Sequence, residues 1–152
     1  MAETAIEFKG VSKRFKGNEY DSVSNVNLKI EKGTFVTILG TSGSGKTTLL
    51  KMVNRIHELT EGELLYFGQD IMKLEANEYR RKIGYVIQQG GLFPHKTVED
   101  NIAVVPKLLK WDKQKIAQRT KELMQLVQLD YEKYRKRYPR SLSGGEQQRV
   151  AL

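Results

Sequence analysis

The fold of this chain is decided by the stretch Gly40-Thr41-Ser42-Gly43-Ser44-Gly45-Lys46-Thr47-Thr48 and by the apolar segments on either side of it. The segment before it, residues 34–39, is rich in β-branched residues and ends at a glycine, which predicts a buried strand. The segment after it carries apolar residues at positions 49, 50, 52, 53 and 56, a spacing typical of a helix. The sequence therefore predicts a strand, a glycine-rich loop and a helix in direct succession.

The glycine-rich loop has the residue types of a phosphate-binding loop. Gly40, Gly45, Lys46 and Thr47 fit the pattern glycine, any four residues, glycine, lysine, then serine or threonine. Glycine permits backbone angles that turn consecutive N–H groups toward one anion at the start of a helix. Lys46 would reach the β- and γ-phosphates and the Thr47 hydroxyl would bind Mg²⁺, whereas an ordinary turn needs neither side chain. We therefore expect nucleotide binding by Gly40, Thr41, Ser42, Gly43, Ser44, Gly45, Lys46, Thr47 and Thr48.

The composition is that of a globular protein and narrows the possible chemistry. The chain has no cysteine, which excludes a disulfide framework, a thiolate metal site and a cysteine nucleophile. No apolar run reaches the roughly 18 residues that a membrane span needs, and we expect no secretory signal from the first residues. Lysine and arginine outnumber aspartate and glutamate by 26 to 18, and the net charge of +8 favours phosphate, anionic lipid or nucleic acid as a ligand.

The rest of the chain divides into a strand-rich first part and a helical second part. Residues 6–9 and 23–30 alternate apolar and polar side chains around a polar turn, which predicts an antiparallel pair of strands. Residues 63–67 and 83–87 predict two further short strands. Asp112 is placed to cap a helix whose apolar residues are Ile116, Leu123, Leu126 and Val127.

A second motif reads Leu142-Ser143-Gly144-Gly145-Glu146-Gln147-Gln148-Arg149. Ser143 and Glu146 have the spacing of a capping box that opens an ordinary helix. A capping box does not need two consecutive glycines, however, and exposed N–H groups at a helix start suit a phosphate. The motif resembles the signature motif of ABC-type ATPases. The resemblance implies that Ser143, Gly144 and Gly145 contact ATP bound to the opposite subunit.

This resemblance implies an α/β fold, a P-loop NTPase of the ABC type with an N-terminal antiparallel β lobe and an α-helical insert. Residues 1–152 would form part of that domain, with the C-terminal core strands of the family missing. Residues 1–96 would be the nucleotide-binding β lobe and loop core, residues 97–140 the helical subdomain, and residues 141–152 the signature motif with the start of its helix.

The same resemblance implies roles for two isolated residues. Gln88 matches the Q-loop glutamine that touches Mg²⁺ and the attacking water, so Lys46 and Gln88 would be catalytic and Thr47 and Gln88 would contact the metal. Phe15 matches the aromatic residue that stacks on adenine, where the family more often has tyrosine. From the residues alone, a glutamine after a strand is usually a solvated turn residue, a single phenylalanine is usually core, and His57 is a solvated side chain near a helix end.

Several branches of the family use this ATPase. Chromosome and DNA-repair members insert long coiled coils between the two motifs, and translation-associated members carry two phosphate loops, neither of which this chain has. Three stretches resemble the ATP-binding subunits of osmoprotectant importers, which carry glycine betaine, carnitine or choline: residues 83–89, residues 92–95 and residues 104–111.

This resemblance implies a cytoplasmic subunit, peripheral on the inner face of the cell membrane. Its partners would be a second ATPase subunit, as a homodimer, and transmembrane permease subunits, with no direct substrate contact and no nucleic acid. Three alternatives remain: an importer of other small polar solutes such as amino acids, a non-hydrolysing interaction or regulatory fragment, and a nucleic-acid patch at residues 133–138 instead of a solvated loop.

The acidic residues of catalysis follow the signature motif in the family, as an Asp for Mg²⁺ and a catalytic Glu. The 152 residues end at Leu152. Residues 126–130 imitate such a strand, but their apolar spacing fits the helix from Lys113. We therefore expect this chain to bind ATP, its cofactor with Mg²⁺, without efficient hydrolysis. We also expect self-association or sheet rearrangement to cover the edges of the strand at residues 34–39.

Overall fold

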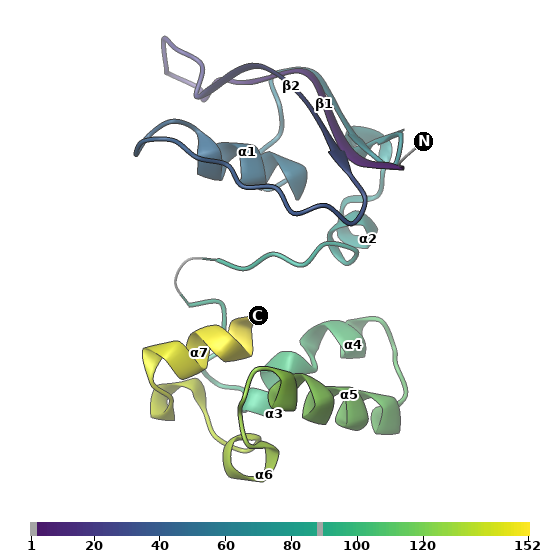
Figure 1. The fold of residues 1–152 in the computed structure, drawn as a ribbon, viewed down its shortest axis with the longest axis vertical. Helices are drawn as coiled ribbons and strands as arrows, with labels where there is room; N and C mark the ends of the chain where they lie inside the picture. The colour runs from purple at the N-terminus through teal and green to yellow at the C-terminus, as the bar shows by residue number, and fades with distance from the viewer. Residues whose placement is uncertain (1–2, 88–89) are drawn as a thin grey trace. The chain divides into compact units, whose positions relative to one another are not determined.

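The computed structural model describes residues 3–87 and 90–152, which form two compact units that divide after Gly84. We call residues 1–84 the sheet unit and residues 85–152 the helical unit, and we describe each by itself (Figure 1). The subdivision expected from the sequence, with boundaries at 96/97 and 140/141, stays a prediction.

An antiparallel sheet forms the upper layer of the sheet unit. Its strands are β1 (Thr4–Lys13), β2 (Val23–Glu31), β3 (Glu61–Tyr66) and β4 (Gln69–Asp70), in the order β2-β1-β3-β4. Both expected N-terminal strands are present and longer than the sequence indicated, and the antiparallel β lobe is confirmed. β1 and β3 are the two interior strands, since each of them pairs along both of its edges.

The core of the sheet unit lies between this sheet and the helix that follows the glycine-rich loop. That helix is α1 (Lys46–Val53), joined by η1 (Ile71–Lys73) and α2 (Ala76–Arg80). The Tyr79 hydroxyl donates to the Val53 carbonyl oxygen, and burial raises the pKa of this phenol to about 12. Each large apolar side chain buried here contributes about 1.5–3 kcal/mol. The core residues are Phe8, Val11, Val23, Leu49, Met52, Leu64, Ile71 and Tyr79.

Two predicted strands are absent from the described residues. Residues 34–39 and 83–87 have no strand pairing, so the prediction that they form strands here is wrong. Phe35 and Leu39 are 94% and 87% exposed, whereas Ile38 packs against the core of the sheet unit. The β-branched composition is present, but a strand exists only where a neighbour accepts and donates its backbone hydrogen bonds.

The helical unit consists of short helices around one small core. They are α3 (Val98–Ile102), α4 (Val104–Leu108), α5 (Lys113–Leu126), α6 (Tyr131–Tyr134), η2 (Pro139–Ser141) and α7 (Gly144–Ala151). The predicted cap of α5 is confirmed, because the Asp112 carboxylate accepts from the N–H groups of Gln114 and Lys115. The predicted apolar face is wrong at Leu126, which is 78% exposed. The buried core comprises Val98, Met124, Leu129, Leu142 and Val150.

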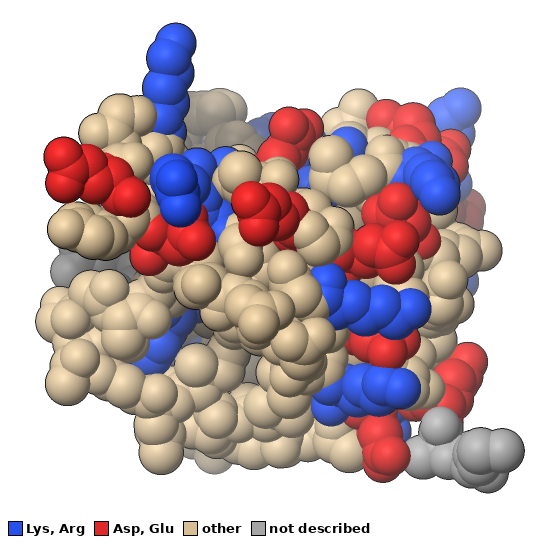
Figure 2. Space-filling view, turned by 90° about the horizontal axis from the view of Figure 1, so that it is seen from above, with Lys and Arg blue, Asp and Glu red and all other residues tan. Residues whose placement is uncertain are grey.

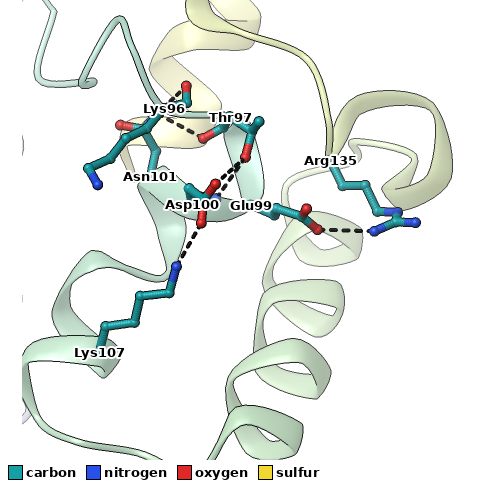
Figure 3. Close-up of polar contacts among 7 residues, drawn as sticks. All are labelled: Lys96, Thr97, Glu99, Asp100, Asn101, Lys107 and Arg135. Carbon is teal, nitrogen blue, oxygen red and sulfur yellow. Dashed lines mark hydrogen bonds and ion pairs between the residues drawn. The ribbon is translucent and has the colours of Figure 1, made fainter.

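Helix α3 is held in this unit by polar contacts at its N-terminus (Figure 3). Thr97 caps it by accepting from the Asp100 N–H at 3.2 Å. Lys107 of α4 lies 2.6 Å from the Asp100 carboxylate, and this contact lowers the pKa of Asp100. Glu99 pairs with Arg135 at 3.2 Å, which joins α3 to the end of α6. These contacts fix the helices against which α7 packs.

Among residues 3–87 and 90–152, no helix has the length and apolar character needed to span a membrane.

Candidate functional site

Lys46 closes the glycine-rich loop from inside. Its ammonium donates to the carbonyl oxygens of Gly40 and Thr41, at 2.9 and 2.6 Å, and to the Ser44 hydroxyl at 3.2 Å. The side chain therefore lies along the concave side of the loop, where the sequence predicted that it would meet phosphate. These three contacts go to neutral oxygens, so a polyphosphate can replace them with stronger contacts in which donor and acceptor are both charged.

Two glycines give the loop its turn. Gly43 and Gly45 have φ values of 81° and 85°, in the left-handed region that favours glycine. Gly45 is also the N-cap of α1, and the Leu49 N–H donates to its carbonyl oxygen at 2.8 Å. A Cβ atom at Gly45 would lie 2.3 Å from the Ser22 carbonyl oxygen. The loop therefore closes only because position 45 has no side chain.

A polar cavity of about 180 Å³ lies where the loop meets Ser22. It is open at the N-terminus of α1, where backbone N–H groups and the helix dipole favour an anion. Thr47 is exposed at its edge. The donors and the hydroxyl fit the phosphate groups and the Mg²⁺ of a bound nucleotide. Besides Ser22, the lining residues are Gly43, Ser44, Gly45, Lys46, Thr47 and Thr48.

Phe15 lies in the loop between β1 and β2, and Ser22 at the end of that loop is the residue that touches Gly45. The ring of Phe15 packs edge-to-face against the imidazole of His57, with ring centroids 5.0 Å apart. The Lys13 ammonium lies 5.1 Å from the centroid of the Phe15 ring. The interpretation of His57 as a solvated side chain is therefore wrong: the turn after α1 is folded back onto the loop that carries Phe15.

The backbone beside Phe15 is fixed by Arg14. The Arg14 guanidinium binds the Asp21 carboxylate at 2.8 Å, and the Arg14 backbone N–H donates to the Thr60 hydroxyl at 3.0 Å. The Ser22 N–H also donates to the Lys13 carbonyl oxygen at 2.8 Å. The loop is thereby closed at its base.

The second motif opens helix α7 in the helical unit. The Ser143 hydroxyl accepts from the Glu146 N–H, and the Glu146 carboxylate accepts from the Ser143 N–H at 2.7 Å. The predicted capping box is confirmed. Ser143, Gly144 and Gly145 are exposed. Packing within the described chain does not require glycine at 144 or 145, since a Cβ placed at either position would meet no atom of a neighbouring segment within 4 Å. Their backbone is open to a ligand or partner.

The motif is anchored to its own unit through side chains that follow the glycines. The Tyr134 hydroxyl lies 2.7 Å from Glu146, and Gln147 donates to the Pro139 and Leu142 carbonyl oxygens at 3.0 and 3.2 Å. Arg149 donates to the Val127 and Gln128 carbonyl oxygens, both at 3.2 Å. The polar residues of the motif thus hold it in place.

Through these contacts, the contribution of Glu146 to the stability of the helical unit depends on pH. The Ser143 backbone N–H, then the Tyr134 hydroxyl, lower the pKa of Glu146 from 4.5 to about 2. A lowered pKa in the folded state means that the stabilisation is present above the unfolded pKa and is lost as the pH falls through the folded pKa. We expect the stability difference between the unmodified chain and Glu146→Gln to shrink between about pH 4.5 and pH 2. Urea unfolding, followed by the fluorescence of Trp111 in the helical unit, measures it; a difference that is constant over this range would contradict the assignment.

Two predictions concern residues outside these motifs. Gln88 lies outside the described residues, so its predicted role stays a prediction. Residues 126–130 form the end of α5 and the turn that follows, and Asp130 caps α6 by accepting from the Lys133 N–H at 2.7 Å. This confirms that they belong to a helix and its cap, not to a strand that ends in a metal carboxylate.

Three of the four basic residues at 133–138 contact other groups of the helical unit. Arg135 binds Glu132 as well as Glu99, while Lys133 and Arg137 lie over the Tyr134 ring at 5.3 and 4.8 Å from its centroid. Figure 2 shows a different face, on the side of the sheet unit, where basic and acidic side chains also lie beside one another. These contacts favour a structural role for the segment over a nucleic-acid patch.

Comparison with known protein families covers both motifs. The family model described as "ABC transporter" matches residues 23–152, from the start of β2 through the glycine-rich loop and the second motif. The chain belongs to the ABC transporter family. Both the glycine-rich loop and the second motif lie within the residues that this family model matches.

Named relatives agree with this membership. The chain is 51% identical over 147 residues to the choline transport ATP-binding protein OpuBA of Bacillus subtilis, covering 97% of this chain and 38% of that protein. It is 47% identical over 150 residues to the osmoprotectant import ATP-binding protein OsmV of Salmonella typhimurium, covering 97% of this chain and 39% of that protein. The predicted resemblance to osmoprotectant importer ATPases is confirmed, and the chain spans about two fifths of the length of these relatives.

A solved ABC transporter structure confirms the predicted fold class. The dimeric structure of the bacterial ABC transporter cassette MJ0796 matches with a TM-score of 0.85 and 36% identity, over 97% of this chain and 67% of that one. The α/β architecture with an antiparallel β lobe and a helical part is therefore shared with an ABC cassette.

Proposed function

We propose that this chain is part of the ATP-binding subunit that energises an importer of quaternary-ammonium osmoprotectants. The observation that carries the proposal is Lys46 held inside a glycine loop at the start of α1, beside an open polar cavity. The names of relatives that are about half identical over nearly the whole chain support the choice of solute class.

The proposed nucleotide site combines three kinds of contact. Lys46 and the N–H groups of residues 40–48 hold the phosphates, Thr47 binds Mg²⁺ together with Gln88, and the ring of Phe15 stacks on adenine. Bound Mg²⁺ neutralises charge on the β- and γ-phosphates. Lys46 would act on the same oxygens and exchange its present hydrogen bonds to the loop carbonyls for contacts with the phosphates.

The whole protein would act as a dimer at the inner face of the cell membrane. Ser143, Gly144 and Gly145 of one subunit would contact the ATP held by the other, and the pair would drive transmembrane permease subunits. The exposed backbone at these positions supports this role. The solute itself would pass through the permease, so no residue of this chain would bind it.

The 152 residues by themselves would bind ATP and turn it over poorly. Phosphoryl transfer depends on groups positioned around Mg²⁺ and the attacking water. The Asp and the Glu that the resemblance implies for these roles follow the signature motif and are not among the 152 residues. We therefore expect binding through the phosphate loop with little release of phosphate.

Calorimetric titration of Mg·ATP into the chain and into Lys46→Ala tests the proposal, with phosphate release followed in the same samples. We expect the affinity to fall about tenfold to hundredfold in Lys46→Ala, since a charge-assisted contact is removed. Equal affinities would overturn the site. Rapid phosphate release that depends on Lys46 would refute the expected lack of turnover and leave the binding site standing.

A further inference from the structure

His57 belongs to neither motif. It lies in the turn that follows α1, the helix that begins at the phosphate loop. The His57 N–H donates to the Lys51 carbonyl oxygen at 3.1 Å, and the Ile56 N–H donates to the same oxygen at 2.9 Å. The buried Asn54 side chain accepts from the Ile56 N–H at 3.2 Å. The turn after α1 is thus closed by its own backbone, which fixes where the imidazole stands.

Helix α1 therefore joins two positions of the proposed nucleotide site. Lys46 stands at its first turn and the turn with His57 follows its last one. The eight residues of α1 span about 12 Å, and His57 lies four residues beyond its last residue. The proposed function places the phosphates of a nucleotide at the start of α1 and its base at the Phe15 ring, against which His57 packs.

The contact between His57 and Phe15 constrains the orientation of the phenylalanine ring. The two ring centroids are 5.0 Å apart and the ring planes meet at 86°, which is the favoured edge-to-face geometry. Hydrogen bonds of Arg14 to Asp21 and Thr60 fix the backbone beside Phe15, but they leave its side-chain rotation free. The imidazole supplies the contact that limits this rotation.

We propose that His57 is a positioning residue for the nucleobase, which holds the Phe15 ring in the orientation on which a purine stacks. The inference rests on the proposed stacking role of Phe15 and names a residue that the two motifs do not contain. Lys13, whose ammonium lies 5.1 Å from the ring centroid, has a flexible stem, so it can leave the ring face when a base arrives.

Two ligands separate a role at the base from a role at the phosphates. Mg·ATP uses both ends of the site, whereas Mg·tripolyphosphate uses the phosphate loop alone. We expect His57→Ala to lower the affinity for Mg·ATP about twofold to tenfold and to leave the affinity for Mg·tripolyphosphate unchanged. His57→Phe, which keeps an aromatic edge at this position, should retain the affinity for Mg·ATP.

A matched control is His95, the second histidine of the chain, which packs against Phe93 in the helical unit with ring centroids 5.9 Å apart. His95→Ala should change neither affinity. Unchanged binding of Mg·tripolyphosphate by His57→Ala also shows that the variant is folded. A loss that is equal for both ligands would overturn the positioning role, as would full affinity of His57→Ala for Mg·ATP.

Combining His57→Ala with Phe15→Ala separates this inference from the proposed function. If His57 acts through Phe15, the double variant binds Mg·ATP no more weakly than Phe15→Ala. Additive losses would overturn the inference while the stacking role stands. Full affinity in Phe15→Ala would overturn the stacking role and this inference together, with the phosphate loop still tested by Lys46→Ala. Absence of binding of either ligand to the unmodified chain would overturn all three.

Discussion

Gly45→Ala is expected to abolish nucleotide binding and to destabilise the sheet unit. The φ value of 85° at this position costs an alanine about 1–2 kcal/mol. The added Cβ would also lie 2.3 Å from the Ser22 carbonyl oxygen, which is backbone and has no side-chain freedom with which to move away. Because Gly45 is the N-cap of α1, the loop and the start of the helix must shift together. We expect the affinity for Mg·ATP to fall more than about 100-fold, through loss of several phosphate contacts at once.

Gly33→Ala is the matched control for this prediction. Gly33 has a similar φ value of 80°, and a Cβ there would have open space, with no described atom within 4 Å. It lies outside the loop at 40–48, so the control carries the backbone strain without the clash. Calorimetry with Mg·ATP and urea unfolding of both variants measure the two effects. Binding by Gly45→Ala as tight as that by Gly33→Ala would show that the contact with Ser22 does not shape the loop.

The strands that could be predicted are those that find their partners nearby in the chain. Residues 6–9 and 23–30 alternate and are joined by a polar turn, and they pair as β1 and β2. Residues 34–39 are rich in β-branched residues, yet they form no strand. Their composition could not show this, because a strand also needs a partner segment, and composition does not tell whether a distant segment will pair. Helix α2 could not be predicted because five residues are too few to show a helical pattern of apolar residues. It is stabilised locally by Glu75, whose carboxylate accepts from the N–H groups of Asn77 and Glu78.

The candidate site was predictable where residue type alone determines the chemistry. Glycines with positive φ, a lysine over the loop and a serine–glutamate cap each follow from a fixed spacing, and the structure has all three. The contacts of Phe15 with His57 and of Arg14 with Thr60 join segments about 40 residues apart, for which no spacing rule exists. The weak signal that was available is the position of His57, one turn beyond a helix that begins at the phosphate loop.

Gly62→Ala is expected to cause the largest loss of stability in the sheet. Gly62 lies in β3 opposite an irregularity of β1, where the pairing shifts between Lys9 and Ser12. A Cβ at Gly62 would lie 2.4 Å from the Gly10 carbonyl oxygen and 2.6 Å from that of Lys9, and the φ value of 87° adds backbone strain. Relief requires β1 and β3 to separate beside the fully buried Val11. We expect a loss of about 2–4 kcal/mol, which corresponds to a fall in melting temperature of about 8–32 °C for a unit of this size.

Gly68→Ala is the control for Gly62→Ala, because it carries the backbone strain of a positive φ value without forcing β1 and β3 apart. Its φ value is 76°, yet within the described part of the chain nothing lies closer than 4 Å to a Cβ at this position. Circular dichroism during heating should therefore show a loss of about 1–2 kcal/mol for Gly68→Ala, from strain alone. The excess loss in Gly62→Ala then measures how closely β1 and β3 approach. Equal melting temperatures would mean that the bulge in β1 absorbs a methyl group, and that the close contact with Gly10 is not what requires glycine at position 62.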